Sequence, residues 1–190
     1  MRKYLLAVIF AFLGSSFLFA DTYNLDKAHT QIGFTVSHLV ISHVSGAFRD
    51  FNGTVNYDPG DVTKSTVEVH IMAASVNTGD DKRDGHLKSS DFFDVQKFSE
   101  LTFKSTKIAK KGDGFVAYGP LTIHRVTKDV ELPFTIAGTI KDGMGKTHLV
   151  AQSSITINRK DYGLTWNRAV EGGVLVGEDV KNDLSVEAVK

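Results

Sequence analysis

Strict alternation of apolar and polar residues runs through most of this chain after residue 20. Successive side chains of a β-strand point to opposite faces, so alternation gives each strand one apolar face and one polar face. About eight such stretches occupy roughly 170 residues, which is typical of a single antiparallel barrel or sandwich. Short connections favour a meander, and closing it into a barrel removes the exposed edges. The sequence therefore predicts an all-β fold with one antiparallel eight-stranded barrel.

The expected strands are separated by turn residues such as Asp58-Pro59-Gly60. They comprise residues 31–37, 51–57, 67–73, 101–103, 115–123, 130–140, 149–157 and 180–188. Gly119-Pro120 falls inside one of them. Because proline cannot donate a hydrogen bond to a central ladder, we expect a bend, a bulge or an edge there.

Residues 1–20 have the layout of a secretory signal peptide rather than of a folded segment. Arg2 and Lys3 are followed by an apolar stretch from Leu5 to Leu13, and Ala20 supplies a small residue for cleavage. An uncleaved anchor is the alternative, but Leu5 to Ala20 is short for a membrane span of about 20 residues. We therefore predict cleavage after Ala20, a mature domain over residues 21–190 without a membrane span, and a periplasmic location.

The charged segment from Gly79 to Lys97 interrupts the alternation and is too long for a bare hairpin loop. Ser89 or Ser90 is a suitable N-cap for a short helix carrying Phe92 and Phe93. We expect this segment to form a short helical lid at one end of the barrel, with the phenylalanines packed inward.

Composition argues against a fold held by disulfides and against a nucleic-acid-binding protein. The chain has no cysteine, so disulfides cannot hold the fold and a hydrophobic core must do so. Without Arg2 and Lys3 the chain has 20 basic and 22 acidic residues, and no basic stripe suggests a nucleic-acid partner.

The sequence offers little sign of metal binding or catalysis. Seven histidines are present, but His29, His38, His43 and His86 match no zinc-ligand spacing. There is no thiol and no GxSxG motif, and the scattered serines and aspartates specify no triad. We therefore expect no metal site, no cofactor and no enzymatic activity.

The apolar strand faces have two interpretations, because an eight-stranded barrel is wide enough to be filled by side chains or to hold one small ligand. If a cavity exists, its expected lining is Ile32, Phe34, Val36, Phe51, Val69, Ile71, Leu87, Phe92, Phe93, Phe103, Leu121, Ile123, Phe134, Ile136 and Ile155. Arg83 and His86 in the lid are candidates for contacting a ligand's polar head group. The alternative is that Arg83 pairs with an aspartate and merely fixes the loop. Arg159 and Asp161 are open to the same two interpretations.

Motifs along the whole mature chain resemble those of the YceI-like bacterial proteins. They include Leu25-Asp26-Lys27-Ala28-His29, Ala74-Ser75-Val76-Asn77-Thr78, Arg83-Asp84-Gly85-His86-Leu87, Asp91-Phe92-Phe93-Asp94 and Arg159-Lys160-Asp161-Tyr162-Gly163. Arg125 is a departure, since it stands where that family usually has glycine. The resemblance implies a lipocalin-like barrel with a long apolar tunnel that takes an isoprenoid or fatty-acyl chain.

We therefore expect a periplasmic carrier for a long-chain apolar ligand: a polyisoprenoid, a quinone-type molecule or a fatty-acyl lipid. A barrel enzyme acting on a bound lipid is one alternative. An outer-membrane barrel is another, although aromatic girdles at the strand ends are not evident and the polar faces, with Glu68, Lys104, Glu131 and Glu187, are well suited to water. A homodimer is also compatible with the sequence.

Overall fold

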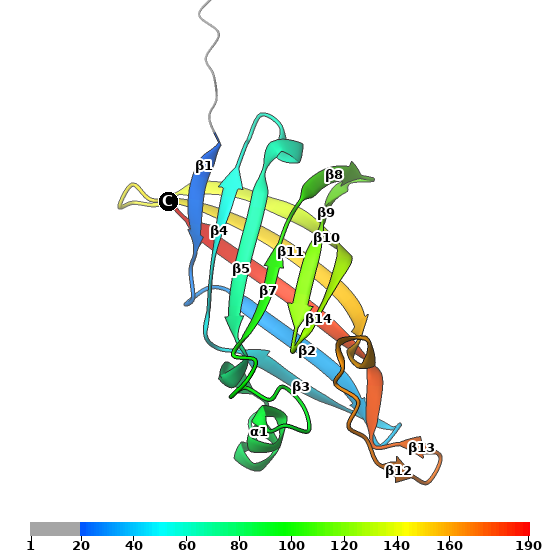
Figure 1. Cartoon of the computed structure of the whole chain (residues 1–190). Helices are drawn as coiled ribbons and strands as arrows, with labels where there is room; N and C mark the ends of the chain where they lie inside the picture. The colour runs from blue at the N-terminus through cyan, green and yellow to red at the C-terminus, as the bar shows by residue number, and fades with distance from the viewer. Residues whose placement is uncertain (1–19) are drawn as a thin grey trace, which may run out of the picture.

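The structure is a computed structural model that describes residues 20–190. The predicted signal peptide, apart from Ala20, lies outside the described residues. Figure 1 shows a barrel of long, strongly curved strands with one short helix, α1 (Asp81–Lys88), below one end. No helix within residues 20–190 is long and apolar enough to cross a membrane.

Eight antiparallel strands close the barrel, as the alternation predicts. In ring order they are β1 (Asp21–Leu25), β4 (Phe51–Tyr57), β5 (Thr66–Met72), β7 (Glu100–Lys104), β9 (Gly114–Ile123), β10 (Val126–Lys141), β11 (Thr147–Asn158) and β14 (Val176–Val189). The ring closes where β1 meets β14 through two residue pairs, Asn24 with Val189 and Leu25 with Ala188. This ladder and that between β7 and β9, which also has two pairs, are the shortest of the ring.

Other short strands extend this sheet. β2 (Gln31–His38) pairs with β14 beyond the end of β1, and β3 (Ser42–Phe48) pairs with β2. β6 (Val76–Asn77) pairs with β3, and β8 (Lys107–Lys111) with β9. A separate hairpin joins β12 (Ala169–Val170) to β13 (Gly173–Val174). The alternation pattern predicted residues 31–37, now part of β2, as one of the eight barrel strands. It predicted no strand at β1 or at β3.

At Gly119-Pro120 strand β9 stops pairing with β8 and begins pairing with β7. This change of neighbouring strand is the irregularity expected at the proline. Before it, Gly114 to Tyr118 pair with β8, and after it Leu121 and Thr122 pair with β7. A Cβ atom on Gly119 would lie 2.1 Å from the carbonyl oxygen of Lys104. Only glycine permits this approach of the two backbones.

The apolar strand faces point into the barrel, and the charged faces point to solvent. Phe51 is 2% exposed, and Leu101 and Phe103 are also buried. On the outside, Lys104 pairs across the strands with Glu68 at 2.8 Å, and Lys111 with Glu131 at 3.3 Å. Such exposed pairs contribute little, so stability depends on the burial of the inward faces.

The lid helix lies earlier in the chain than expected and does not carry the two phenylalanines. Asp80, and neither Ser89 nor Ser90, caps the helix, its carboxylate accepting a hydrogen bond from the Arg83 amide at 2.9 Å. Ser89 instead ends α1, so Phe92 lies beyond the helix. The inward packing is nevertheless as expected, because Phe92 is 7% exposed. Aspartate satisfies the free amides at the start of a helix as serine does, and its charge also interacts favourably with the helix dipole.

Candidate functional site

The barrel interior contains two apolar cavities. The upper cavity, of about 120 Å³, lies between β4, β5, β9, β10, β11 and β14. The lower cavity, of about 100 Å³, lies beneath the lid and is lined by β2, β11, β14 and the segment that follows α1. The two cavities have no lining residue in common. The interior is therefore divided, whereas the resemblance implied one long tunnel.

Ten of the fifteen residues predicted to line a cavity do so. Val69, Phe103, Phe134 and Ile136 line the upper cavity, and Phe34, Val36, Leu87, Phe92, Phe93 and Ile123 line the lower one.

The other five predicted residues line neither cavity: Ile32, Phe51, Ile71, Leu121 and Ile155. The first four belong to one packed cluster, in which Ile32 and Phe51 are buried. Leu121 also contacts a second cluster, around Phe103, whose members border the upper cavity. We call Ile32, Phe51, Ile71 and Leu121 the dividing layer, because they pack with side chains that border the lower cavity and Leu121 also contacts those that border the upper one.

A groove of about 440 Å³ opens beside the lower cavity, and the two share Phe34, Val36, Leu87, Phe92 and Val176. The rings of His86, Phe92 and Trp166 pack together along it, with centroids 4.7 to 5.2 Å apart. The groove thus adjoins the lower cavity through a shared apolar wall. Trp166 was not among the predicted site residues, although it is the only tryptophan of the chain.

Arg83 and His86 both line this groove, so the structure brings the two head-group candidates together. Both also stabilise the lid. Arg83 donates from Nε to the Thr78 hydroxyl at 2.7 Å, and His86 Nε2 lies 2.8 Å from an Asp91 carboxylate oxygen. Buried Asp84 accepts hydrogen bonds from the amide and hydroxyl of Thr78. The expected Arg–Asp pair is therefore replaced by a network in which Thr78 joins Arg83 to Asp84.

Arg159 is the buried cation of the site, at 5% exposure on the wall of the lower cavity. Its guanidinium donates to the carbonyl oxygens of Gly177 at 2.8 Å and Val176 at 3.2 Å, and also to that of Leu164. Burial lowers the pKa of Arg159, and the nearby charge of Glu178 opposes this change. Arg159 thus holds the segment after β11 against β14, while Asp161 pairs on the surface with Lys128. Arg159 and Asp161, which the sequence left open to the same two interpretations, therefore have different roles.

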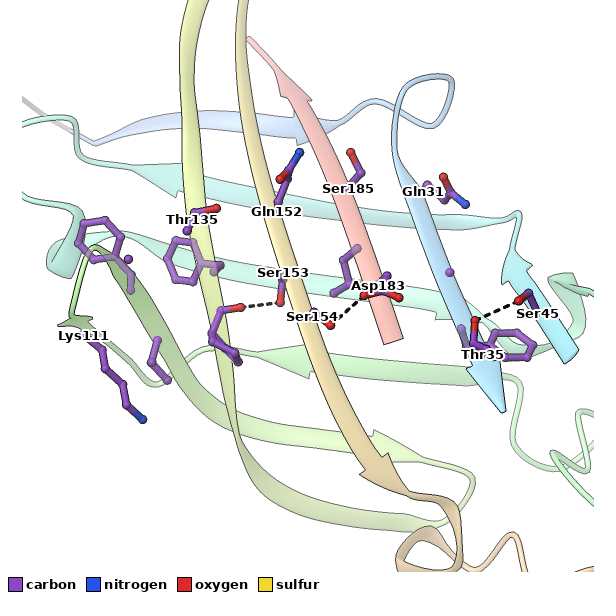
Figure 2. Close-up of a pocket in the computed structure, with 18 of the residues that line it drawn as sticks. Gln31, Thr35, Ser45, Lys111, Thr135, Gln152, Ser153, Ser154, Asp183 and Ser185 are labelled. Carbon is purple, nitrogen blue, oxygen red and sulfur yellow. Dashed lines mark hydrogen bonds between the residues drawn. The ribbon is translucent and has the colours of Figure 1, made fainter. Parts of the chain in front are cut away.

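A larger hollow, of about 850 Å³, is a broad groove on the outer face of the sheet (Figure 2). Its polar side chains include exposed Gln152 and Asp183, and Ser154 donates to Asp183 at 2.8 Å. Thr35 and Ser45 face each other across β2 and β3 at 3.0 Å. This open, hydroxyl-rich surface would leave an apolar chain exposed to solvent. The candidate site is therefore the interior with its lid groove.

Comparison with known proteins agrees with this architecture. Residues 23–188 match the model of the YceI-like domain. The chain belongs to the YceI-like family. It is 35% identical over 169 residues to a UPF0312 protein of Staphylococcus aureus, covering 87% of this chain and 95% of that protein. A UPF0312 protein of Serratia proteamaculans is also 35% identical, over 173 residues covering 90% of this chain and 88% of that protein.

Solved structures of YceI-like and related proteins have the same fold. A YceI protein of Campylobacter jejuni is 31% identical, with a TM-score of 0.71 and coverage of 100% of this chain and 99% of that one. BcnA of Burkholderia cenocepacia, at 22% identity, has a TM-score of 0.75, covering 86% of this chain and 98% of that one. A polyisoprenoid-binding domain from Saccharophagus degradans is 18% identical, with a TM-score of 0.61 and coverage of 87% and 97%. The family resemblance seen in the motifs is confirmed.

Proposed function

We propose that this protein is an exported, periplasmic carrier that holds a long-chain apolar ligand inside its barrel. The observation that carries the proposal is the apolar interior, where aliphatic and aromatic side chains line most of the two cavities and about half of the lid groove. The polyisoprenoid-binding domain of Saccharophagus degradans, which shares the fold, is consistent with a ligand of this class.

The sizes of these spaces indicate how a chain enters. Ligand pockets usually measure about 300–1,000 Å³, so the lid groove is large enough but each internal cavity is smaller than a usual pocket. We propose that the chain enters beside Trp166, fills the groove and lower cavity, and reaches the upper cavity when the dividing layer moves. Arg83 and His86 then lie where a polar head group would remain.

The energetics favour a long chain. Burying one methylene contributes about 0.8 kcal/mol, and micromolar affinity requires about 8 kcal/mol. At least about ten carbons must therefore be buried before the costs of association are counted.

The polar outer strand faces, with Lys104 and Glu131, support a barrel that faces water rather than lipid.

Titration with saturated fatty alcohols of increasing length tests the proposal. Affinity should rise by about fourfold per methylene, which corresponds to 0.8 kcal/mol, until the available space is filled. Affinity that does not change with chain length contradicts the carrier function, and turnover of the alcohol would favour the enzyme alternative. Native mass spectrometry before and after organic extraction gives the mass of any natural ligand and the oligomeric state.

Matched variants locate the ligand. Ile157→Asn places an amide on the wall of the lower cavity and should weaken binding, whereas Thr156→Asn on the exposed face of the same strand should not. Arg83→Ala and His86→Ala test the head-group contacts with a ligand that has a polar head. If they lower the melting temperature but leave the affinity unchanged, these two residues only stabilise the lid.

A further inference from the structure

The Asp26–His29 turn, part of the first family motif, has no part in the proposed lipid site, yet it lies in a cluster of titratable groups. The turn connects β1 to β2 and lies against Glu187 of β14. His148 of β11 and Asp142 of the β10–β11 turn complete the cluster. In Figure 1 the β10–β11 turn lies beside the C-terminus, away from α1.

The backbone holds the turn and Glu187 in fixed positions. The Asp26 amide donates to the Glu187 carbonyl at 2.8 Å, and the Thr30 amide donates back to the Asp26 carbonyl at 2.9 Å. The Thr30 hydroxyl bonds to both backbone groups of Glu187, its amide and its carbonyl, each at 3.0 Å. The side chains of Asp26, His29 and Glu187 therefore converge from a frame that is already formed.

The distances between the three side chains suit one bound ion. His29 Nδ1 lies 2.8 Å from Asp26 Oδ2 and 3.9 Å from Glu187 Oε1, and all three atoms lie within 4.8 Å of one another. A tetrahedral zinc ion with bonds of about 2.0–2.2 Å needs neighbouring ligand atoms about 3.3–3.6 Å apart. Small side-chain movements produce that spacing. His29 is 63% exposed, so water can reach the ion and complete its coordination.

Glu187 is oriented by a second layer of side chains. His148 Nδ1 lies 2.7 Å from Glu187 Oε1, and His148 Nε2 lies 3.2 Å from Asp142 Oδ2. Asp142 is itself fixed by the amides of Met144 and Lys146. Hydrogen-bonded partners of this kind set the orientation of metal ligands and raise metal affinity.

We propose that Asp26, His29 and Glu187 form a binding site for a divalent transition metal ion of the zinc type. One imidazole and two carboxylates suit zinc or cobalt better than magnesium or calcium, which prefer oxygen ligands alone. The ion joins the β1–β2 turn to β14 next to the two-pair ladder that closes the barrel. Its bound state therefore stabilises this closure, independently of any lipid in the interior.

The experiment is a titration of untagged, chelator-treated protein with Zn²⁺ by calorimetry and with Co²⁺ by visible absorption. We expect one saturable site in the micromolar range and a Co²⁺ spectrum that Zn²⁺ abolishes. The melting temperature should rise by about 5–10 °C when Zn²⁺ exceeds its dissociation constant roughly 100-fold. Absence of saturable binding, or a site saturated equally well by Mg²⁺, overturns the proposal.

Variants place the ion. His29→Ala and the isosteric Glu187→Gln should each abolish the Co²⁺ spectrum, while His148→Gln should weaken affinity by about 10–100-fold. His70→Ala is the matched control, because His70 also contacts two carboxylates, at 3.1 and 3.3 Å, but through opposite ring nitrogens that cannot share one ion. Binding that survives His29→Ala, or that His70→Ala removes, overturns the assignment.

Discussion

His124 occupies an unusual position in the hairpin between β9 and β10. Its φ angle is 58°, in the left-handed region, and its buried Nδ1 atom has no hydrogen-bond partner among residues 20–190. The ring packs edge-on against Phe98 at 4.4 Å. Burial, aided by the charge of Arg125, lowers the pKa of His124, while the Tyr162 backbone and Asp94 oppose the change. The folded protein thus favours the neutral imidazole.

This residue should make stability sensitive to acid. Because its pKa is lower when folded, His124 contributes stability above its ordinary value of 6.5, which is lost as pH falls toward the folded-state pKa. His124→Asn keeps a side chain that tolerates the left-handed region but cannot titrate. Urea unfolding at about pH 7.5 and about pH 5.5 should show a smaller loss of stability in the variant than in the unchanged protein.

His124→Val is the control for backbone strain. A β-branched residue in the left-handed region should cost about 1–2 kcal/mol relative to His124→Asn at both pH values, because neither of these two side chains titrates. If His124→Asn and the unchanged protein lose equal stability on acidification, the titration of His124 is not responsible.

At the scale of the strand, Gly119 allows β9 to exchange one neighbour for another. Gly119→Ala should destabilise the protein by about 1–3 kcal/mol, because its Cβ would collide with the Lys104 backbone, which cannot rotate away. Gly143→Ala, where no atom lies within 4 Å, should change stability by less than about 0.5 kcal/mol. Equal denaturation midpoints for the two variants would show that β9 tolerates a wider spacing.

The cap of α1 gives a second prediction at this scale. Asp80→Ala removes the acceptor of the Arg83 amide and should destabilise the helix by about 1 kcal/mol, seen as faster amide hydrogen exchange within Asp81–Lys88. Asp81→Ala removes a neighbouring charge but no cap and should have a smaller effect. Exchange rates equal in both variants would mean that the lid is held by Asp84 and Phe92 rather than by its cap.

Some elements were predictable from the sequence and others were not. Strand β10 alternates over many residues, whereas β1 contributes a single buried side chain, Tyr23, too few for a periodic signal. In β3 the inward position of Gly46 carries no side chain, because the ring of Phe34 covers it. The helix was misplaced because serine and aspartate are both good caps, and the choice between them depends on where Phe92 packs.

At the scale of the whole molecule, alternation predicts which way a side chain points but not how much space remains. Phe134 and Leu121 both face inward as predicted, but only Phe134 borders a cavity. The difference arises from packing between strands that are distant in sequence. For the same reason, histidine spacing gave no sign of the cluster at His29, because its partner Glu187 is at the other end of the chain.

The dividing layer gives the last prediction. Leu121→Ala removes a side chain that contacts both core clusters, so it should destabilise the protein by about 2–4 kcal/mol and connect the two cavities. Ile108→Ala should cost a similar amount but enlarge only the upper cavity. In the fatty-alcohol titration, the length at which affinity stops rising should therefore increase for Leu121→Ala and stay unchanged for Ile108→Ala.

Identical limiting lengths in all three proteins would mean that the layer already opens freely, or that the chain never reaches it. Hydrogen exchange with and without ligand separates these cases, because only an opening layer gains protection at Leu121 when the chain is bound.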